Sequence, residues 1–288
     1  MAQTKIIQRR IRSVKNAKQI TKALEVVAAS RMRRVVEAVA RSRTYGNLSA
    51  AIMRRIATSY EAKTHPYFAP SSDKPTLYIV MTSDRGQAGA FNSNVFNLAL
   101  DDFKADKARP QVLVFGRKGA RFFAQLAGID LVGAYEDIAD IPEANVFSPV
   151  LDLIADAVNE GKTGTVKVIY TEFLSPLSQR TTSFQLLPID VPTEAENQLP
   201  KEIAYEFEPE IGDVLDEGIK LYFEAHLMQA KIEAAASEHA MRMVAMGNAN
   251  RNASDLIDDL TLELNATRQA AITQEIAEIT GGAAAISQ

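Results

Sequence analysis

The feature of this sequence that most constrains its fold is the final stretch, residues 209–288, which reads as one very long helix. Between Gly218 and Gly281 it contains a single Gly and no Pro, so little would interrupt a helix there. A helix of about 70 residues spans roughly 100 Å, more than a single globular domain of this size requires. Near its end, apolar residues recur at the 4-3 spacing of a coiled-coil seam: Ile272, Ile276, Ile279, Ala283 and Ile286. The stretch therefore predicts a helix that needs a partner.

That partner is expected at the other end of the chain, where residues 6–59 form a second long helical pattern. Its apolar residues fall into short groups with internal spacings of 3 or 4, such as Ile20, Leu24 and Val27. Between groups the phase slips, which argues against a strict coiled coil and predicts a helix that changes neighbours along its length. We expect residues 1–60 and 209–288 to pair as an antiparallel rod.

The middle of the chain, residues 74–190, alternates strand and helix patterns. Short apolar runs predict strands, and amphipathic stretches between them predict helices. The predicted strands cover residues 76–82, 111–115, 129–132, 165–173 and 181–187, and the predicted helices cover 92–106, 117–126 and 150–159. This order is typical of a Rossmann-like α/β domain with a mainly parallel sheet. The last strand is expected to run antiparallel because few residues separate it from its predecessor. The overall prediction is an α/β fold with a coiled coil of the terminal helices.

Charge is distributed unevenly. Residues 1–60 hold 14 Lys and Arg residues but only two acidic ones, whereas the rest of the chain is strongly acidic. A basic helix of this kind is attracted to an acidic protein surface, a phosphate backbone or anionic lipid. One alternative function is therefore a basic coiled-coil protein that binds nucleic acid, although no aromatic residue precedes Tyr45 to stack on bases.

No residues form a recognisable catalytic, metal or cofactor-binding motif. The chain has no Cys, which excludes disulfides and thiol chemistry. Residues 116–119 (GRKG) resemble a phosphate-binding turn but lack the spacing of a Walker loop. His65, His226 and His239 are isolated, so surface or packing roles are expected for them. The sequence predicts a protein that is not an enzyme by itself; a small-molecule enzyme built on the α/β domain is the remaining alternative.

Several stretches resemble one known family, the gamma subunit of F-type ATP synthases. The matching stretches are RIRSVKNAKQITKALEVVAASRM (10–32), SDRGQAGAFN (83–92), YTEFLS (170–175), SEHAMRMVAMGNANRNA (237–253) and TRQAAITQEIAEITGGAAAI (267–286). In the stretch 83–92, Gln87 and Ala88 stand where the family pattern has Leu and Cys. Leu24 and Val26 take the place of the Met usual in the first stretch. The resemblance covers the whole chain.

The resemblance implies a non-catalytic rotor subunit of a proton-translocating ATP synthase. Its terminal helices would turn inside a ring of three alpha and three beta subunits and couple ion flow to ATP synthesis or hydrolysis. Further implied partners are the epsilon subunit, the c-ring and the delta subunit, with an inhibitor protein as an additional candidate. Nucleic acid is not an expected partner, and the membrane would be reached only through the c-ring. The implied location is the cytoplasmic face of the bacterial inner membrane rather than the mitochondrial inner membrane.

The resemblance also assigns contact residues. Those expected to contact beta subunits are Arg9, Arg10, Lys18, Lys22, Leu24, Val26, Arg242, Arg268, Gln269, Thr273 and Glu275. The apolar end of the last helix is expected to sit in a bearing within the alpha-beta ring, through Ile276, Ile279, Ala283 and Ile286. A foot that meets the c-ring and epsilon is expected at Tyr205, Phe207 and Glu208.

Overall fold

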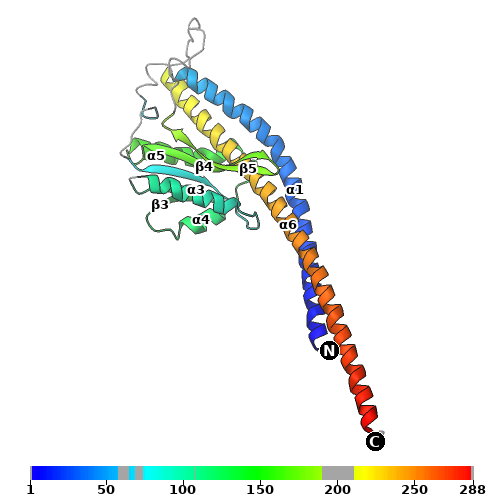
Figure 1. Cartoon of the computed structure of the whole chain (residues 1–288). Helices are drawn as coiled ribbons and strands as arrows, with labels where there is room; N and C mark the ends of the chain where they lie inside the picture. The colour runs from blue at the N-terminus through cyan, green and yellow to red at the C-terminus, as the bar shows by residue number, and fades with distance from the viewer. Residues whose placement is uncertain (1, 58–64, 69–73, 107, 190–210, 287–288) are drawn as a thin grey trace. The chain divides into compact units, whose positions relative to one another are not determined.

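A computed structural model describes residues 2–57, 65–68, 74–106, 108–189 and 211–286. Two helices are far longer than the rest, α1 (Ala2–Ile56) and α6 (Ile211–Ile286), which confirms the long helices predicted at the two ends. The chain divides into two compact units. The first, here called the distal unit, holds residues 1–28 and 242–288; the second, the proximal unit, holds residues 29–241. Both long helices contribute to both units (Figure 1).

The proximal unit contains the predicted α/β domain. Its strands are β1 (Thr76–Met81), β2 (Gln111–Phe115), β3 (Asp130–Tyr135), β4 (Thr165–Ser175) and β5 (Ser178–Leu187). Its helices are α3 (Phe91–Ala105), α4 (Arg117–Phe123), the 3-10 helix η1 (Ala144–Phe147) and α5 (Ser148–Asn159). The strands form one sheet in the order β3-β2-β1-β4-β5. All neighbours are parallel except β4 and β5, so the predicted antiparallel pairing of the last strand is confirmed.

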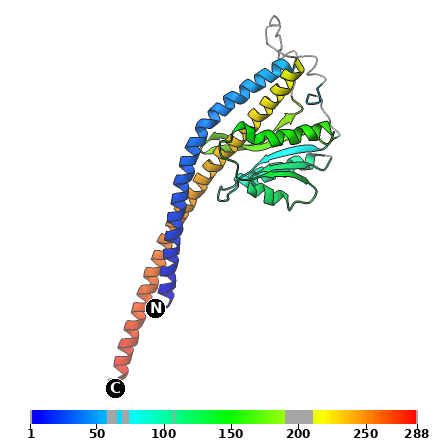
Figure 2. The ribbon, with the colours of Figure 1, turned by 180° about the vertical axis from the view of Figure 1, so that it is seen from behind.

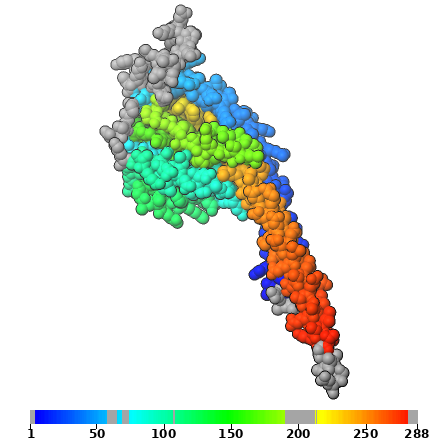
Figure 3. Space-filling model, in the orientation of Figure 1, coloured from blue at the N-terminus to red at the C-terminus, as the bar shows by residue number. Residues whose placement is uncertain are grey.

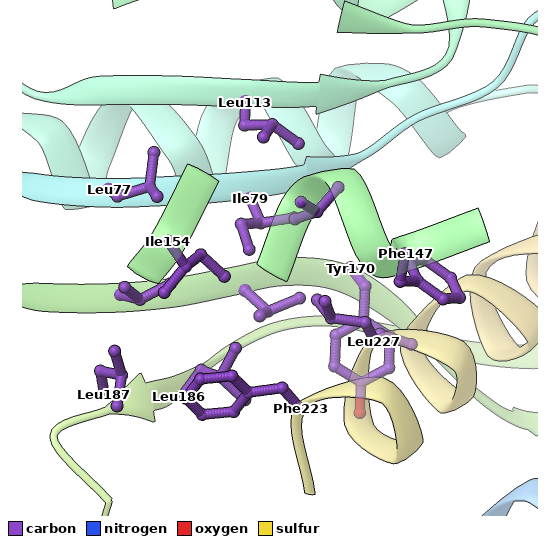
Figure 4. Packing of buried hydrophobic residues seen from close by; sticks show 14 of the residues in the cluster. Leu77, Ile79, Leu113, Phe147, Ile154, Tyr170, Leu186, Leu187, Phe223 and Leu227 are labelled. Atoms are coloured by element: carbon purple, nitrogen blue, oxygen red, sulfur yellow. The ribbon is translucent and has the colours of Figure 1, made fainter. Parts of the chain in front are cut away.

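Side chains alternate between the two faces of the sheet along each strand, and a cluster of buried residues covers each face. From β1, Tyr78 and Val80 join a cluster with residues of α3 and α4 on one face. Leu77 and Ile79 point to the opposite face, where they meet Ile154 of α5 and other buried residues (Figure 4). Phe223 and Leu227 of α6 belong to this second cluster, as do Met53 and Ile56 of α1. The two long helices are thus part of the core of the proximal unit.

The seam of α1 differs from the prediction. In both units a continuous series of buried and half-buried positions follows a strict 4-3 spacing, with no slip of phase, and other buried or half-buried residues such as Leu24 and Ala38 lie beside it. In the distal unit these positions are Ile7, Ile11, Val14, Lys18, Thr21, Glu25 and Ala28; in the proximal unit they are Met32, Val35, Val39, Ser42, Gly46, Ser49, Met53 and Ile56. The predicted slip was wrong because the seam continues through polar and small residues. Several apolar residues assigned to it, including Ile20, Val27 and Leu48, are at least half exposed.

The apolar stripe at the end of α6 is also placed differently. In the distal unit α1 and α6 run antiparallel: Gly247 lies against Glu25, and Arg268 and Ile272 line one groove with Thr4 and Gln8. The α6 residues that face α1 are Asn250, Ala253, Ile257, Leu260, Leu264, Thr267 and Ala271. Because α1 begins at Ala2, α6 continues past its partner (Figures 1 and 2). Ile272 lines this groove beside α1, but Ile276 and Ile279 are 57% and 71% exposed. The expectation that the whole apolar stripe packs against the N-terminal helix was therefore wrong.

Candidate functional site

The exposed surface of the distal unit carries most of the predicted contact residues. On α1, Arg9 and Arg10 are exposed, whereas Lys18 lies on the seam and is half-buried. Lys22 forms an ion pair with Glu25 at 3.2 Å, so part of its charge is neutralised within the helix. Leu24 is half-buried, and Val26 is 58% exposed. The structure thus separates these residues into exposed ones and ones that also serve the helix pair.

The predicted contact residues of α6 are mainly exposed. Arg268 and Glu275 line a groove of about 270 Å³ together with Thr4 and Gln8 of α1. Gln269 and Thr273 are exposed, but the Thr273 hydroxyl donates to the Gln269 carbonyl at 2.9 Å. Arg242 is half-buried and lies elsewhere along the helix. The structure therefore brings Arg268 and Glu275 to one groove and leaves Arg242 apart from them.

The end of α6 presents an apolar surface. Ile272, Ile276 and Ile279 are 45%, 57% and 71% exposed, and on the visible face of the distal unit no other segment covers this part of α6 (Figure 3). Ala283 lies within the helix and Ile286 is its last residue. The predicted foot residues Tyr205, Phe207 and Glu208 lie outside the described residues. The exposed isoleucines form a stripe that water solvates poorly, as expected of a surface that contacts another protein.

The turn at residues 116–119 is filled by the chain's own groups. Gly116 has φ 102° and ψ 138°, and the Gly119 N–H donates to the Thr82 hydroxyl at 3.0 Å. The Arg117 N–H donates to the Asp84 carboxylate at 3.0 Å, and the Lys118 N–H donates to the Ser83 carbonyl, also at 3.0 Å. The amides at the start of α4 are thus bound by protein oxygens, which accounts for the turn without a phosphate.

Two histidines of α6 lie in the proximal unit, His239 buried and His226 half-buried. His239 is 3% exposed, and its Nε2 lies 2.9 Å from Asp140 Oδ2. Burial is the largest single effect and raises the pKa of Asp140, but the hydrogen bond with His239 and the electrostatic effects of His239, Lys231 and Arg31 together outweigh it, so the net effect lowers that pKa. His226 packs beside Tyr222 and Phe184, and burial lowers its pKa to about 4. His226 thus packs among aromatic rings, whereas His239 is paired with Asp140, a partner 99 residues away that the sequence did not indicate. Among the described residues, no group of three or more acidic or histidine side chains is arranged to hold a metal ion.

One polar cluster was missed by sequence reasoning. The Arg43 guanidinium donates to both carboxylate oxygens of Glu233, each at 2.9 Å, and Glu233 is 1% exposed. This hydrogen bonding raises the pKa of Arg43. Arg43 also donates to the Phe173 carbonyl at 2.6 Å, and Ser237 donates to the Thr171 carbonyl at 3.0 Å. The available signal was Glu233 and Ser237 flanking a run of alanines on a long helix, where a buried surface is expected.

Comparison with known proteins points to one family. The family model described as ATP synthase matches residues 3–286. A relative from Pelotomaculum thermopropionicum, named ATP synthase gamma chain, is 37% identical over 97% of this chain and 98% of its own length. A protein of the same name from Stenotrophomonas maltophilia is 38% identical over 99% of this chain and all of its own length.

Solved structures agree on the fold. The central stalk and c-ring structure of the Tetrahymena thermophila mitochondrial ATP synthase contains a chain that is 24% identical, with a TM-score of 0.64 over 80% of this chain and 99% of that one. A chain in the Euglena gracilis mitochondrial ATP synthase is 18% identical, with a TM-score of 0.66 over 99% of this chain and 95% of that one. None of these matches favours nucleic-acid binding.

Proposed function

The chain belongs to the ATP synthase gamma chain family, and we propose that it is the non-catalytic central shaft of a proton-translocating F-type ATP synthase. In this proposal the paired helices α1 and α6 turn inside a ring of three alpha and three beta subunits. The turning couples proton flow through the membrane sector to ATP synthesis or hydrolysis in the ring. Residues 1–60 and 209–288 serve as the shaft, and residues 74–190 form the α/β domain attached to it.

The observation that carries the proposal is the uncovered apolar end of α6. This helix extends past its partner and exposes Ile272, Ile276 and Ile279, and the exposure of this apolar surface to water is unfavourable. A ring of subunits closed around this end would remove that surface from water. We assign Ile276, Ile279, Ala283 and Ile286 to such a bearing. A smooth apolar surface suits a bearing because hydrophobic attraction is non-directional and opposes turning only weakly.

Contacts to beta subunits are proposed on the exposed polar faces of the same unit. The basic residues Arg9, Arg10, Lys18 and Lys22 of α1 are complementary to an acidic surface on beta, because the N-terminal 60 residues carry a large positive excess. Leu24 and Val26 add apolar contact area. On α6 the proposed contacts are Arg242, Arg268, Gln269, Thr273 and Glu275.

Other partners complete the proposed complex. The c-ring and the epsilon subunit are proposed to meet a foot at Tyr205, Phe207 and Glu208, and delta and an inhibitor protein are further members of the assembly. Among the described helices, none is both long and apolar enough to cross a membrane. We propose that the chain reaches the membrane only through the c-ring, at the cytoplasmic face of a bacterial inner membrane.

The test is assembly and rotation with alpha and beta subunits. Purified chain mixed with them should co-purify as one complex that hydrolyses ATP, whereas the chain alone should not hydrolyse ATP. A bead fixed to the α/β domain of a surface-bound complex should turn in one direction when ATP is added. A matched control ends at Ala271, which keeps the helix pair but removes the apolar end; it should bind the ring more weakly. A full-length chain that fails to co-purify, or that binds without turning, would rule out the shaft.

A further inference from the structure

The strand β4 has an open edge that two helices fill. Its parallel pairing with β1 ends where Val80 meets Ile169, yet β4 continues to Ser175. In the described part of the sheet, no strand lies beside β4 on that side beyond this point. Main-chain groups on an open edge need other partners when they are buried, and both Thr171 and Phe173 are buried.

Three side chains from α1 and α6 take the place of the missing strand. The Ser237 hydroxyl donates to the Thr171 carbonyl at 3.0 Å, and the Phe173 N–H donates to Glu233 at 3.2 Å. Arg43 of α1 then donates to the Phe173 carbonyl at 2.6 Å. Both long helices are therefore hydrogen-bonded to the main chain at the end of one strand.

Glu233 is the centre of this arrangement. Its carboxylate accepts two hydrogen bonds from Arg43, one from the Phe173 N–H and one from the Gln229 amide at 3.0 Å. A carboxylate has about four acceptor positions, so the hydrogen-bonding capacity of this one is filled. If α6 turned about its axis or slid along β4, the carboxylate would remain buried without the donors of Arg43 and Phe173, which is strongly unfavourable. The cluster therefore specifies one rotational setting of α6.

The surrounding apolar contacts lack this property. Phe223, Leu227 and Ala230 of α6 pack into the core of the proximal unit, but hydrophobic contact is non-directional. A smooth helix surface held by such contacts alone resists separation better than it resists rolling. Resistance to rolling requires directional bonds, and Arg43, Glu233 and Ser237 supply them.

We propose that the Arg43–Glu233 ion pair, seated on the open edge of β4, is the joint through which torque passes between the helix pair and the α/β domain. This inference rests on the proposed shaft function. Arg43 and Glu233 are positioning residues in it, because they act by fixing α6 against the sheet and contact no substrate. Loss of this joint should loosen the connection between the helix pair and the α/β domain while leaving the distal unit unchanged.

The test replaces Glu233 with its neutral isostere in the assembled complex. Glu233→Gln in inverted membrane vesicles should hydrolyse ATP, with an uncoupler present, within about twofold of the wild-type rate, because the surfaces that meet the ring are unaltered. Without the uncoupler, the proton gradient reached per ATP hydrolysed should fall by about threefold or more, because the joint must then work against a load. Proton uptake is followed with a pH-sensitive dye.

The matched control is Glu172→Gln, which removes the same charge from the neighbouring residue of β4. Glu172 accepts hydrogen bonds from Arg180 of β5, at 2.7 and 3.0 Å, so the control leaves the three hydrogen bonds between the long helices and β4 in place. Its charge acts on Arg43 only through space. The gradient per ATP of this control should equal that of the wild type. Ser237→Ala, which removes only one hydrogen bond to β4, should show a smaller loss than Glu233→Gln.

Two outcomes would overturn the joint. One is an unchanged gradient per ATP in Glu233→Gln; the other is an equal fall in uncoupled hydrolysis and in pumping, which would indicate a general structural role. If the Glu233→Gln chain does not assemble into the complex, the same two measurements on Ser237→Ala serve as the test, and either of these two results in that variant would contradict the proposed joint. Failure of the wild-type chain to co-purify with alpha and beta is a separate result that concerns the shaft itself.

Discussion

Replacing Gly116 with Ala should destabilise the α/β domain severely. Gly116 has φ 102° and ψ 138°, close to a region of backbone conformation that is almost confined to glycine. A Cβ there would lie 2.4 Å from the Thr82 carbonyl oxygen and 2.7 Å from its carbon. Thr82 has little freedom to move away, because its N–H donates to the Phe115 carbonyl at 2.7 Å and its hydroxyl donates to the same oxygen at 2.8 Å.

The magnitude follows from two costs. An unfavourable backbone conformation costs about 1–3 kcal/mol, and forcing a methyl group into packed structure costs about 1–3 kcal/mol more. Together, Gly116→Ala should lower the free energy of unfolding by about 2–6 kcal/mol, a large part of the roughly 5–15 kcal/mol of an ordinary domain. Thermal unfolding of the purified chain, followed by circular dichroism, measures the effect.

Gly128 provides a matched control. Its φ is also positive, at 90°, but a Cβ there would have no atom within 4 Å. Gly128→Ala should therefore incur only the conformational cost of about 1–3 kcal/mol. At about 2–4 °C per kcal/mol, Gly116→Ala should melt clearly below Gly128→Ala. Equal melting temperatures for the two variants would refute the argument that the turn is closed sterically against Thr82.

Three further predictions concern a histidine, the seam and the end of α6. Burial lowers the pKa of His226 to about 4, so below pH 6.5 the unfolded chain binds a proton that the folded chain does not, and the free energy of unfolding should fall by up to about 3 kcal/mol as the pH drops from 6.5 towards 4. In urea unfolding, His226→Phe should lose less stability than the wild type over this range. An equal loss in both would contradict the lowered pKa of His226. Thr21 occupies a half-buried seam position, so Thr21→Leu should stabilise the helix pair by about 1 kcal/mol in hydrogen-exchange measurements. The control is Thr44→Leu, because the Thr44 hydroxyl also donates to a carbonyl of its own helix, at 3.1 Å, but on an exposed face; it should stabilise the helix pair much less. Comparable stabilisation by both variants would show that position 21 does not face α6. Combined Ile276→Ser and Ile279→Ser substitutions should change the free energy of unfolding by under about 0.5 kcal/mol each but reduce aggregation of the isolated chain. As a control, Ile7→Ser, at a 2% exposed position, should destabilise the helix pair. A marked loss of stability in the double variant would mean that Ile276 and Ile279 are already covered.

The elements of the α/β domain could be predicted from the sequence because their signals are local. The strand predicted over residues 111–115 has the observed bounds, since β-branched and aromatic residues there are flanked by Pro110 and Gly116. The strand predicted over residues 129–132 is observed as Asp130–Tyr135. Its last residues include Gly133 and Ala134, which have low β propensity and are held in the strand by pairing with β2.

The helix seam could be predicted only in part. A search for apolar residues finds Ile7 and Met32 but passes over Lys18, Thr21 and Glu25, whose aliphatic parts fill the same seam. It also assigns Ile20 and Leu48 to the seam, although they are 61% and 59% exposed. The spacing of 3.5 residues is the more reliable signal here, because backbone geometry fixes which residues face the partner and composition only modulates it.

The flanking alanines indicate that Glu233 is buried, but its pairing with Arg43 could not have been predicted, because the two residues lie 190 positions apart and meet only through the fold. Their meeting place has a topological explanation. The chain passes from β1 to β2 on one side and later from β3 to β4 on the other, so the strand order reverses between β1 and β4. In open α/β sheets this reversal leaves a crevice at the carboxyl ends of the strands, where ligands commonly bind. Here the main-chain groups of β4 that lie beyond its pairing with β1 are bound by Ser237 and Glu233 of α6. The α/β domain thus holds α6 at the sheet edge where related architectures bind a ligand, and a helix held there by directional bonds is fixed in rotation as well as in position.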